Sequence, residues 1–293
     1  MRRATRLRGR RRGARGGYGR SMERASVELE GVSETTLWTL YHRAVEARRP
    51  DAVLADSLAV ELVEAINFPF VERFGDGAGL SQWQALRARC FDEAVRRFLG
   101  DHPDGTVVAL GEGLETQLWR VDNGRVRWVS VDLPEVAAVR RALLPEHPRT
   151  TLVAGSALDP GWLDEVHTAS GVLVTAQGLL MYLRPDEVHA LVARCAGRLR
   201  GGVLVFDAVP RWLAERGRSG RLRTGTGYEP PAWTWALDRD EERRLRRLPH
   251  VTALGTLRLP RGRGVVHGWL LPLAARAPWL RRLLPTVLVA QFA

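Results

Sequence analysis

Five short apolar segments that alternate with helical patterns constrain the fold of this chain more than any other feature. They are residues 107–110, 126–132, 150–155, 171–178 and 201–209. Strands that are apolar throughout, rather than alternating with polar residues, are typical of a parallel sheet that helices cover on both faces. Doubly wound sheets of this kind bind their ligands at the carboxyl ends of the strands. The sequence therefore predicts an α/β, Rossmann-like fold with a ligand site at that edge.

The residues before this region are helical in pattern. Apolar spacing predicts helices over residues 35–49, 55–66 and 82–99, and no strand is expected there. We expect residues 34–100 to form a helical cap on a cofactor-binding core that spans residues 105–210.

The residues after the core differ in character. Residues 211–235 are rich in Gly, Pro, Arg and Trp, which favours a lid-like insertion, and a charged helix is expected over 238–248. Two further strands are predicted at 251–259 and 264–273, the second antiparallel, before a short helical end. They complete a doubly wound, mostly parallel sheet of seven strands, and residues 22–293 are predicted to be one domain.

The net charge of +11 is concentrated at one end of the chain. Residues 1–20 contain nine arginines and no acid, and the chain has no lysine. Three interpretations compete for residues 1–21: a nucleic-acid arm, a membrane-surface tether, or sequence upstream of a true start at Met22. We expect a disordered basic tail, and no nucleic-acid partner, because no recognition motif accompanies it.

The two cysteines, Cys90 and Cys195, lie far apart in helical patterns without a CxxC partner, so no metal site is expected. Buried thiols of this kind are typical of a reducing cytoplasm. No run of about 18 apolar residues is present, so we expect neither a membrane span nor a membrane partner. The sequence predicts a cytoplasmic protein.

The strongest local signal is a glycine turn, Leu-Gly-Glu-Gly-Leu at residues 110–114, between the first strand and a helix. Gly111 and Gly113 let the backbone approach a bound nucleoside because no Cβ intervenes. Asp132 stands at the end of the next strand, where an acid accepts hydrogen bonds from both ribose hydroxyls of a nucleoside cofactor. A tight turn with Asp132 as a helix cap is the structural alternative.

Two cofactors fit this layout. A dinucleotide fingerprint requires a third glycine where Thr116 stands, and Glu112 and Glu115 place negative charge where a pyrophosphate would lie. S-adenosylmethionine has no phosphate and carries a sulfonium cation. The pattern favours a methyltransferase over an NAD(P)-dependent oxidoreductase.

Four motifs, in this order, resemble the leucine carboxyl methyltransferase superfamily. They are LRARCFDEAVRRFL, VVALGEGLETQLWRVDNGRVRWVSVDLPEV, AGSALDPGWLDEV and TAQGLLMYLRPDEV. The similarity is greatest to the bacterial branch of tetracenomycin-type polyketide O-methyltransferases, and it runs from about Thr35 to the C-terminus. It implies a class I methyltransferase that uses S-adenosyl-L-methionine.

The resemblance also implies roles for cofactor-binding residues. Arg87, rather than its neighbour Arg89, would pair with the methionine carboxylate of the cofactor. Gly111 and Gly113 would lie under its methionine and ribose, and Asp132 would hold the ribose. The segment Ser156, Ala157 and Leu158 would border the adenine.

The resemblance places two further residues at the reacting centre. Gln177 would face the cofactor there, and Tyr182 would lie close to the substrate. Relatives that modify phosphatases have a glutamate at position 177 and an acid at position 157, where this chain has Gln177 and Ala157. Asp159 is the alternative partner of the adenine amine. These departures leave open a cofactor-binding pseudo-enzyme.

The acceptor is predicted to be a small molecule. Methyl transfer to a carboxylate needs no base, whereas transfer to a hydroxyl usually does. Candidate bases are few (His42, His189 and His267), and only His42 lies on the N-terminal helix that the family folds over its active site. A carboxylate acceptor is favoured, a phenolic hydroxyl is the alternative, and Tyr228, Trp233 and Trp235 could form an apolar wall for it.

Overall fold

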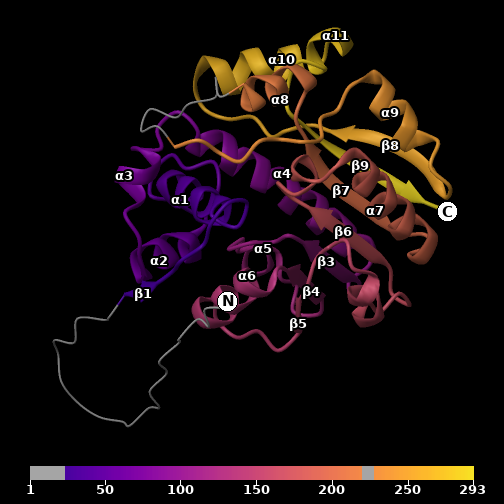
Figure 1. Ribbon diagram of the computed structural model, residues 1–293, viewed down its shortest axis with the longest axis horizontal. Helices are drawn as coiled ribbons and strands as arrows, with labels where there is room; N and C mark the ends of the chain where they lie inside the picture. The colour runs from indigo at the N-terminus through magenta and orange to yellow at the C-terminus, as the bar shows by residue number, and fades with distance from the viewer. Residues whose placement is uncertain (1–23, 220–227) are drawn as a thin grey trace.

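The computed structural model describes residues 24–219 and 228–293 (Figure 1). The predicted tail at residues 1–21 lies outside the described residues. The described chain forms a central sheet with helices on both faces and a cap of helices at one end (Figure 1).

The sheet has seven strands in the order β5-β4-β3-β6-β7-β9-β8. They are β3 (Thr106–Leu110), β4 (Arg127–Asp132), β5 (Thr150–Ala154), β6 (Val172–Ala176), β7 (Val203–Ala208), β8 (Val251–Leu257) and β9 (Thr286–Phe292). The five strands from β3 to β7 pair in parallel, and β9 runs antiparallel to β7 and β8. The predicted fold class, a doubly wound and mostly parallel sheet, is confirmed.

Strand β3 shows why the sheet is buried on both sides. All five of its residues are buried, and alternate side chains point to opposite faces. Val108 and Leu110 pack in the cluster that includes Leu191 of α7 (Pro185–Arg198). Val107 and Ala109 pack in the cluster of α4 (Ser81–Asp101) and α5 (Gln117–Val121). The apolar pattern of the strand therefore reflects two cores, one on each face.

The N-terminal cap is helical, as predicted. Its helices are α1 (Thr35–Ala47), α2 (Ser57–Ala65) and α3 (Phe70–Phe74), which share a core with Tyr228. Asp56 caps α2, because its side chain accepts a hydrogen bond from the backbone nitrogen of Ala59. Helix α3 was not predicted, and the expectation of no strand in this region is wrong, because β1 (Ala25–Ser26) pairs in parallel with β2 (Ile66–Asn67).

The remaining elements lie around the core. They are α6 (Pro134–Leu143), the 3₁₀ turns Pro160–Glu165 and Leu180–Tyr182, α8 (Arg211–Arg218) and α9 (Arg239–Arg246). The predicted charged helix is confirmed as α9, whose first turn Asp238 caps by accepting from the nitrogens of Asp240 and Glu241. The segment expected to form a lid-like insertion, residues 211–235, begins with a helix, α8.

The predicted strand at 264–273 is wrong. A π-helical turn (Val266–Leu270) continues there into α10 (Leu271–Ala274), and α11 (Pro278–Arg281) follows. Val266, Trp269, Leu270 and Leu273 recur at helical spacing, but an uninterrupted apolar segment does not distinguish helix from strand. The last strand is β9, where a helical end was expected. It fits as a strand because β7 and β8 pair with it on both sides.

Candidate active site

A cavity of about 940 Å³ opens at the carboxyl ends of β3, β6 and β7. The strand order reverses between β3 and β6, and ligands of doubly wound sheets bind at such a point. Its inner wall is the turn after β3, the residues after β6 and the end of β7. Helices α1 and α4 and residues 256–287 form the other walls. The cavity therefore lies where the sequence predicted a ligand site.

The turn after β3 needs both of its glycines. Gly111 and Gly113 each have φ +59°, which favours glycine. A Cβ at position 113 would also lie 2.5 Å from Oγ1 of Thr36, and one at position 111 would lie 2.9 Å from Cδ1 of Leu179. Both glycines line the cavity, as predicted. Close packing against α1 and the turn after β6 thus fixes the shape of this wall.

Asp132 supports this turn from the end of β4. Its Oδ2 accepts a hydrogen bond from the nitrogen of Gly113 at 2.6 Å, and its Oδ1 accepts from Leu133 at 2.9 Å. Burial raises the pKa of the Asp132 carboxyl. The side chain lies at the turn but does not line the cavity.

The predicted adenine segment also lies outside the cavity wall. Ser156, Ala157 and Leu158 follow β5, and Gly155 donates to the backbone oxygen of Asp132 at 2.8 Å. Ser156 Oγ accepts from the nitrogen of Leu158 at 3.2 Å. The segment is therefore beside Asp132, at the same edge of the sheet.

Arginines neutralise the two glutamates of the turn. Nη2 of Arg140 lies 2.8 Å from Oε2 of Glu112. Burial raises the pKa of Glu115, but Arg43 and Arg120 outweigh it and lower that pKa to about 2. The expectation that these glutamates would repel a pyrophosphate is thus wrong, because their charge is compensated within the protein. The charges of the turn therefore do not distinguish S-adenosylmethionine from a dinucleotide as the cofactor.

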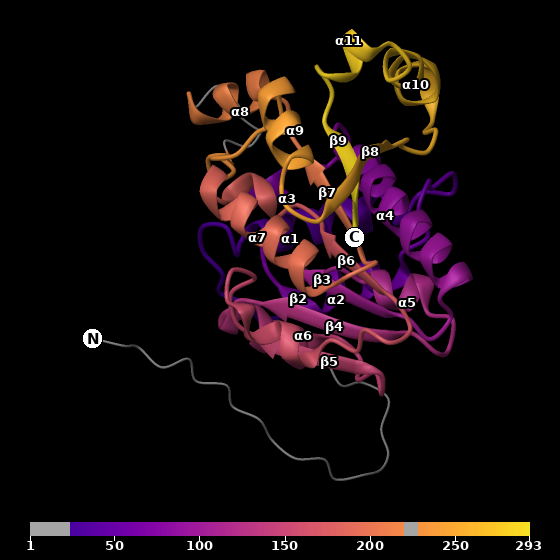
Figure 2. The same ribbon diagram turned by 90° about the vertical axis from the view of Figure 1, so that its right-hand side faces the viewer.

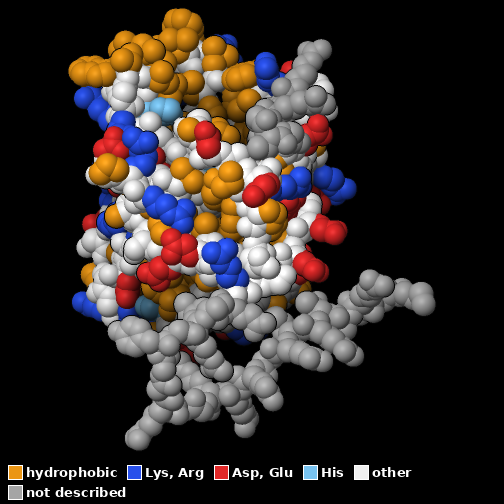
Figure 3. Space-filling view, turned by 90° about the vertical axis from the view of Figure 1, so that its left-hand side faces the viewer, with side chains coloured by type: hydrophobic (Ala, Val, Ile, Leu, Met, Phe, Trp, Pro, Cys, Tyr) orange, Lys and Arg blue, Asp and Glu red, His pale blue; other side chains and the backbone are white. Residues whose placement is uncertain are grey.

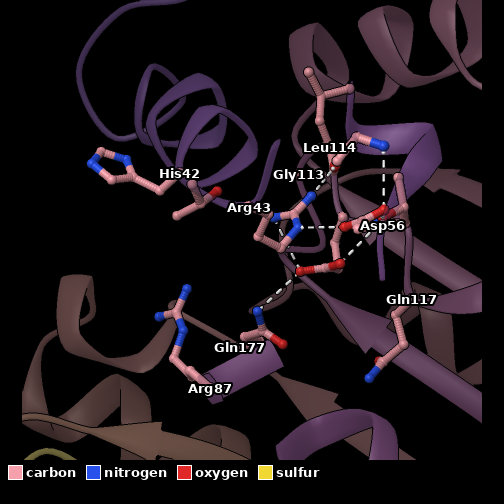
Figure 4. Close-up of polar contacts among 12 residues, drawn as sticks. His42, Arg43, Asp56, Arg87, Gly113, Leu114, Gln117 and Gln177 are labelled. Atoms are coloured by element: carbon pink, nitrogen blue, oxygen red, sulfur yellow. Dashed lines mark hydrogen bonds and ion pairs between the residues drawn. The ribbon is translucent and has the colours of Figure 1, made fainter. Parts of the chain in front are cut away.

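Arg120 is the centre of a buried network that joins the cap to the core. Its guanidinium lies 2.9 Å from Oδ2 of Asp56 and 2.8 Å from Oδ2 of Asp92, in addition to Glu115. Arg43 bonds the same Asp56 and donates to the backbone oxygen of Leu114 at 2.8 Å (Figure 4). The network therefore fixes α1 and α4 against the glycine turn.

Gln177 and Arg87 are among the residues of the cavity wall that have a buried polar atom without a hydrogen-bond partner in the described chain. Gln177 donates from Nε2 to Oε2 of Glu115 at 3.0 Å, which leaves its Oε1 unsatisfied. Arg87 donates from Nη1 to Oδ2 of Asp207 at 2.8 Å, which leaves its Nε unsatisfied. Both side chains line the cavity. A ligand with an ammonium and a carboxylate, such as the amino acid end of S-adenosylmethionine, would satisfy an acceptor and a donor of this kind.

The other two predicted catalytic residues differ in position. Tyr182 lines the cavity, and burial raises its pKa, so its hydroxyl stays protonated. His42 does not line the cavity: Figure 4 shows it leaving α1 away from Arg43, and its Nδ1 donates to the backbone oxygen of Trp38 at 2.7 Å. Burial lowers the pKa of His42. The structure does not bring His42 to the reacting centre.

The predicted aromatic wall is mostly wrong. Trp233 lines the cavity, but Tyr228 packs against Phe74 at 4.9 Å between ring centres, within the cap. Trp235 is buried in the core, where its Nε1 donates to Glu241 at 2.8 Å. Trp38 of α1 and Trp83 of α4 line the cavity instead, together with Trp233.

Sequence reasoning missed the outer wall of the cavity. Residues 256–287 contribute Arg258, Arg261, Arg276 and Arg281 to it, as well as His267. A usable signal is in the sequence, since residues 243–293 contain ten arginines and no acid. The described residues contain no group of three or more metal-ligating side chains. None of the helices that the structure describes is both long enough and apolar enough to cross a membrane.

The model of the family described as leucine carboxyl methyltransferase matches residues 36–196, which is more than half of the chain. The chain belongs to the leucine carboxyl methyltransferase family. It is an S-adenosylmethionine-dependent methyltransferase, which confirms the predicted resemblance, enzyme class and cofactor and excludes the oxidoreductase alternative.

Individual relatives agree with this assignment. The tetracenomycin polyketide synthesis O-methyltransferase TcmP of Streptomyces glaucescens is 36% identical over 203 residues, covering 69% of this chain and 75% of that protein. The S-adenosyl-L-methionine-dependent methyltransferase dpfgK of Gibberella zeae is 31% identical over 211 residues, covering 65% and 70%. A solved DUF574 family protein from Streptomyces avermitilis has the same fold, with a TM-score of 0.53, 17% identity, and coverage of 84% and 100%.

Proposed function

We propose that this methyltransferase acts on a carboxylate oxygen of a small molecule with a flat, apolar body. The observation that carries the proposal concerns the carboxylates of the cavity wall. Among the described residues they are Glu112, Glu115 and Asp207, and each is paired with an arginine. None of them is free to remove a proton from an acceptor, so an acceptor that is already ionised fits best.

We propose that the cofactor lies along the inner wall. Arg87 would hold its carboxylate, and Oε1 of Gln177 would accept from its ammonium group. Asp132 and the segment 156–158 would have to face the ribose and adenine after a local opening of the wall, because neither lines the cavity. When bound, the cofactor supplies a methyl group on a positively charged sulfur.

The contact between Gln177 and Glu115 explains why this chain has a glutamine at position 177. A glutamate at position 177 would place its carboxylate beside Oε2 of Glu115, which now accepts from Nε2 of Gln177 at 3.0 Å. Two carboxylates at that distance repel each other. Gln177 is therefore compatible with an active enzyme, rather than a mark of a pseudo-enzyme.

The outer wall suits an anionic acceptor. Arg258, Arg276 and Arg281 line it, and none has an ion pair within the parts of the chain that the structure describes. Trp83 and Trp233 offer flat apolar surfaces to the body of the acceptor. The protein would mainly hold the carboxylate oxygen and the methyl carbon about 3 Å apart and aligned. No proton needs to move.

A phenolic hydroxyl is the second candidate acceptor, because His267 lines the cavity. Burial, followed by the charge of Arg263, lowers the pKa of His267, so the ring is neutral at pH 7 and could accept a phenolic proton. Nε2 of Gln82 donates to Nδ1 of His267 at 3.3 Å, so this hydrogen bond would have to break before Nδ1 accepts the proton. The tetracenomycin polyketide synthesis O-methyltransferase of Streptomyces glaucescens suggests aromatic, polyketide-type acids and phenols as the first acceptors to test.

The experiment is incubation with methyl-labelled cofactor and matched pairs of aromatic acids and phenols. We expect a base-labile ester and a kcat/KM that is flat between about pH 6 and 9, because a carboxylate is ionised throughout. His267→Asn should leave this activity intact. A base-stable ether whose formation is lost in His267→Asn would replace the carboxylate with the phenol. Binding of S-adenosylhomocysteine without any turnover would indicate a pseudo-enzyme.

We also propose a cytoplasmic location. Cys90 and Cys195 are free and buried, as expected in a reducing compartment. Burial raises the pKa of each thiol to about 12, so neither is a reactive nucleophile.

A further inference from the structure

The segment between β8 and β9 exposes an unusual amount of apolar surface. Seven large side chains there are at least half exposed, and we call them the apolar ridge: Val265, Val266, Trp269, Leu270, Leu273, Trp279 and Leu283. In Figure 3 hydrophobic side chains gather at the top of the molecule, where α10 and α11 lie in Figure 1. Exposed apolar patches of this kind mark interaction surfaces.

The ridge is the outer face of a helical segment whose inner face lines the cavity. His267, Leu271 and Ala275 recur every four residues and line the cavity. Val266 and Trp269, with the rest of the ridge, lie on the opposite side and are exposed. A helix that is apolar on both sides is normally buried on both sides. The inner side borders the cavity, and no described residue covers the outer side, so the outer side needs a partner.

The charge around the ridge indicates the chemistry of that partner. Residues 243–293 contain no acid, and four arginines accompany the ridge: Arg261, Arg276, Arg281 and Arg282. None of the four has an ion pair with another described residue, and the guanidinium of Arg261 lies 5.7 Å from the ring centre of Trp269. Tryptophan and leucine flanked by arginines are typical of segments that bind the interface of anionic membranes.

We propose that the apolar ridge docks on an anionic lipid surface. Trp269 and Trp279 would enter the headgroup region, and Arg261 and Arg282, which are not assigned to the acceptor, would face the lipid phosphates. Figure 2 shows α10 and α11 projecting from one end of the molecule, and a projecting ridge enters a deformable interface without a matching groove. The expectation of no membrane partner considered spans and a surface tether at residues 1–21, but not surface binding by the segment after β8, which requires no span.

A second copy of the chain fits the ridge less well. A two-fold contact through the ridge would bring the same arginines together across the interface. Residues 243–293 offer no acid to pair with them, so like charges would repel. This docking does not depend on which acceptor the enzyme methylates.

The test is co-sedimentation of the full chain with vesicles of phosphatidylcholine, with or without about 30% phosphatidylglycerol. We expect binding to the anionic vesicles only, with a blue shift of tryptophan emission. Trp269→Ser combined with Trp279→Ser should weaken binding at least about tenfold and remove the shift. Residues 1–23 contain no tryptophan, so binding through the basic tail alone would give no shift. The control is Val71→Ser in α3, which changes an apolar side chain that is also more than half exposed but lies outside the ridge.

Other outcomes would overturn the proposal. Equal vesicle binding by the double variant and the unchanged chain would exclude the ridge from the contact. A dimer that the double variant converts to a monomer, without vesicle binding, would make the ridge an interface between copies. Absence of vesicle binding together with binding of an acidic protein would assign the ridge to that protein. The double variant should bind S-adenosylhomocysteine normally, because neither tryptophan lines the cavity, and this separates failure of docking from failure of the enzyme.

Discussion

The inner and outer walls of the cavity differ in whether their charged side chains form ion pairs. On the inner wall, Glu112, Glu115 and Asp207 are each paired with an arginine at 2.8 to 3.2 Å. On the outer wall, arginines such as Arg258 and Arg276 are exposed and have no ion pair among the described residues. Apolar side chains next to them are exposed as well.

This difference separates a fixed binding surface from an adaptable one. The paired, buried charges of the inner wall hold a single geometry, which suits a cofactor that is the same in every cycle. The exposed arginines and apolar side chains of the outer wall lose their water only when a partner arrives. Substitutions in each wall test whether the two walls differ in this way.

The largest effect is expected for Arg120→Ala. Its guanidinium contacts Asp56, Asp92 and Glu115, and removing it leaves three buried carboxylates with too little positive charge. Breaking a buried charge network costs about 3–5 kcal/mol, which urea denaturation would measure as a lower free energy of unfolding. The control is Arg125→Ala, which breaks an exposed pair with Asp104 and should cause no measurable loss. Equal losses in the two variants would contradict a rigid inner wall.

The next effect is a pH dependence that Glu115 controls. Its folded pKa of about 2 lies below the ordinary value of 4.5. A lowered pKa stabilises the fold above pH 4.5, and this stabilisation is lost as the pH falls from 4.5 towards 2; it is of the order of 3 kcal/mol. Denaturation of the unchanged chain and of Glu115→Gln, compared across pH 2 to 7, should differ in this window. Asp132 is common to both chains, so its opposite shift cancels in the difference. The charge of Glu115 contributes to the raised pKa of Glu112, so part of the difference comes from Glu112. Parallel curves would show that Glu115 is not held by Arg43 and Arg120.

The sheet could be predicted from sequence because each of its strands has a local pattern. An apolar run such as Val172–Ala176 needs only the general rule that both faces are covered. The segment after β8 could not be predicted in the same way, since its outer face is exposed apolar surface and its pattern matched a strand. The helical segment 266–274 could be recognised only from the structure, in which its inner side chains line the cavity.

The candidate site was predicted in part for similar reasons. Arg87, Gly111, Gly113 and Gln177 stand in motifs, and the structure places all four on the cavity wall. Arg120 pairs with Asp56, which lies 64 positions away in the sequence, so no local sequence pattern could predict this pair. The choice of His42 failed because adjacent residues of a helix point in different directions, so Arg43 faces the glycine turn and His42 does not.

A smaller effect, on binding rather than folding, is expected for Arg87→Ala. Loss of a charged hydrogen bond should weaken binding of S-adenosylhomocysteine by about 1.5–3 kcal/mol, measured by calorimetry. Asp207→Asn should have a smaller effect of the same sign, because Asp207 orients Arg87 and also accepts from the nitrogen of Gly178 at 2.6 Å. Arg89→Ala is the control, since Arg89 is partly exposed and pairs with Glu93. Unchanged affinity in a folded Arg87→Ala variant would remove Arg87 from the cofactor site.

The smallest effect is expected for Trp279→Ser in the outer region. This side chain is 67% exposed, so the folded protein gains little from it, and the free energy of unfolding should change by no more than about 0.5 kcal/mol. Trp128→Ala in β4 offers the contrast: Trp128 is 1% exposed, and its loss should cost about 3–5 kcal/mol. Urea denaturation of both variants at low protein concentration measures the difference. A large loss in Trp279→Ser would mean that the outer region packs as tightly as the inner wall, since only a side chain that is covered in the folded state can stabilise it.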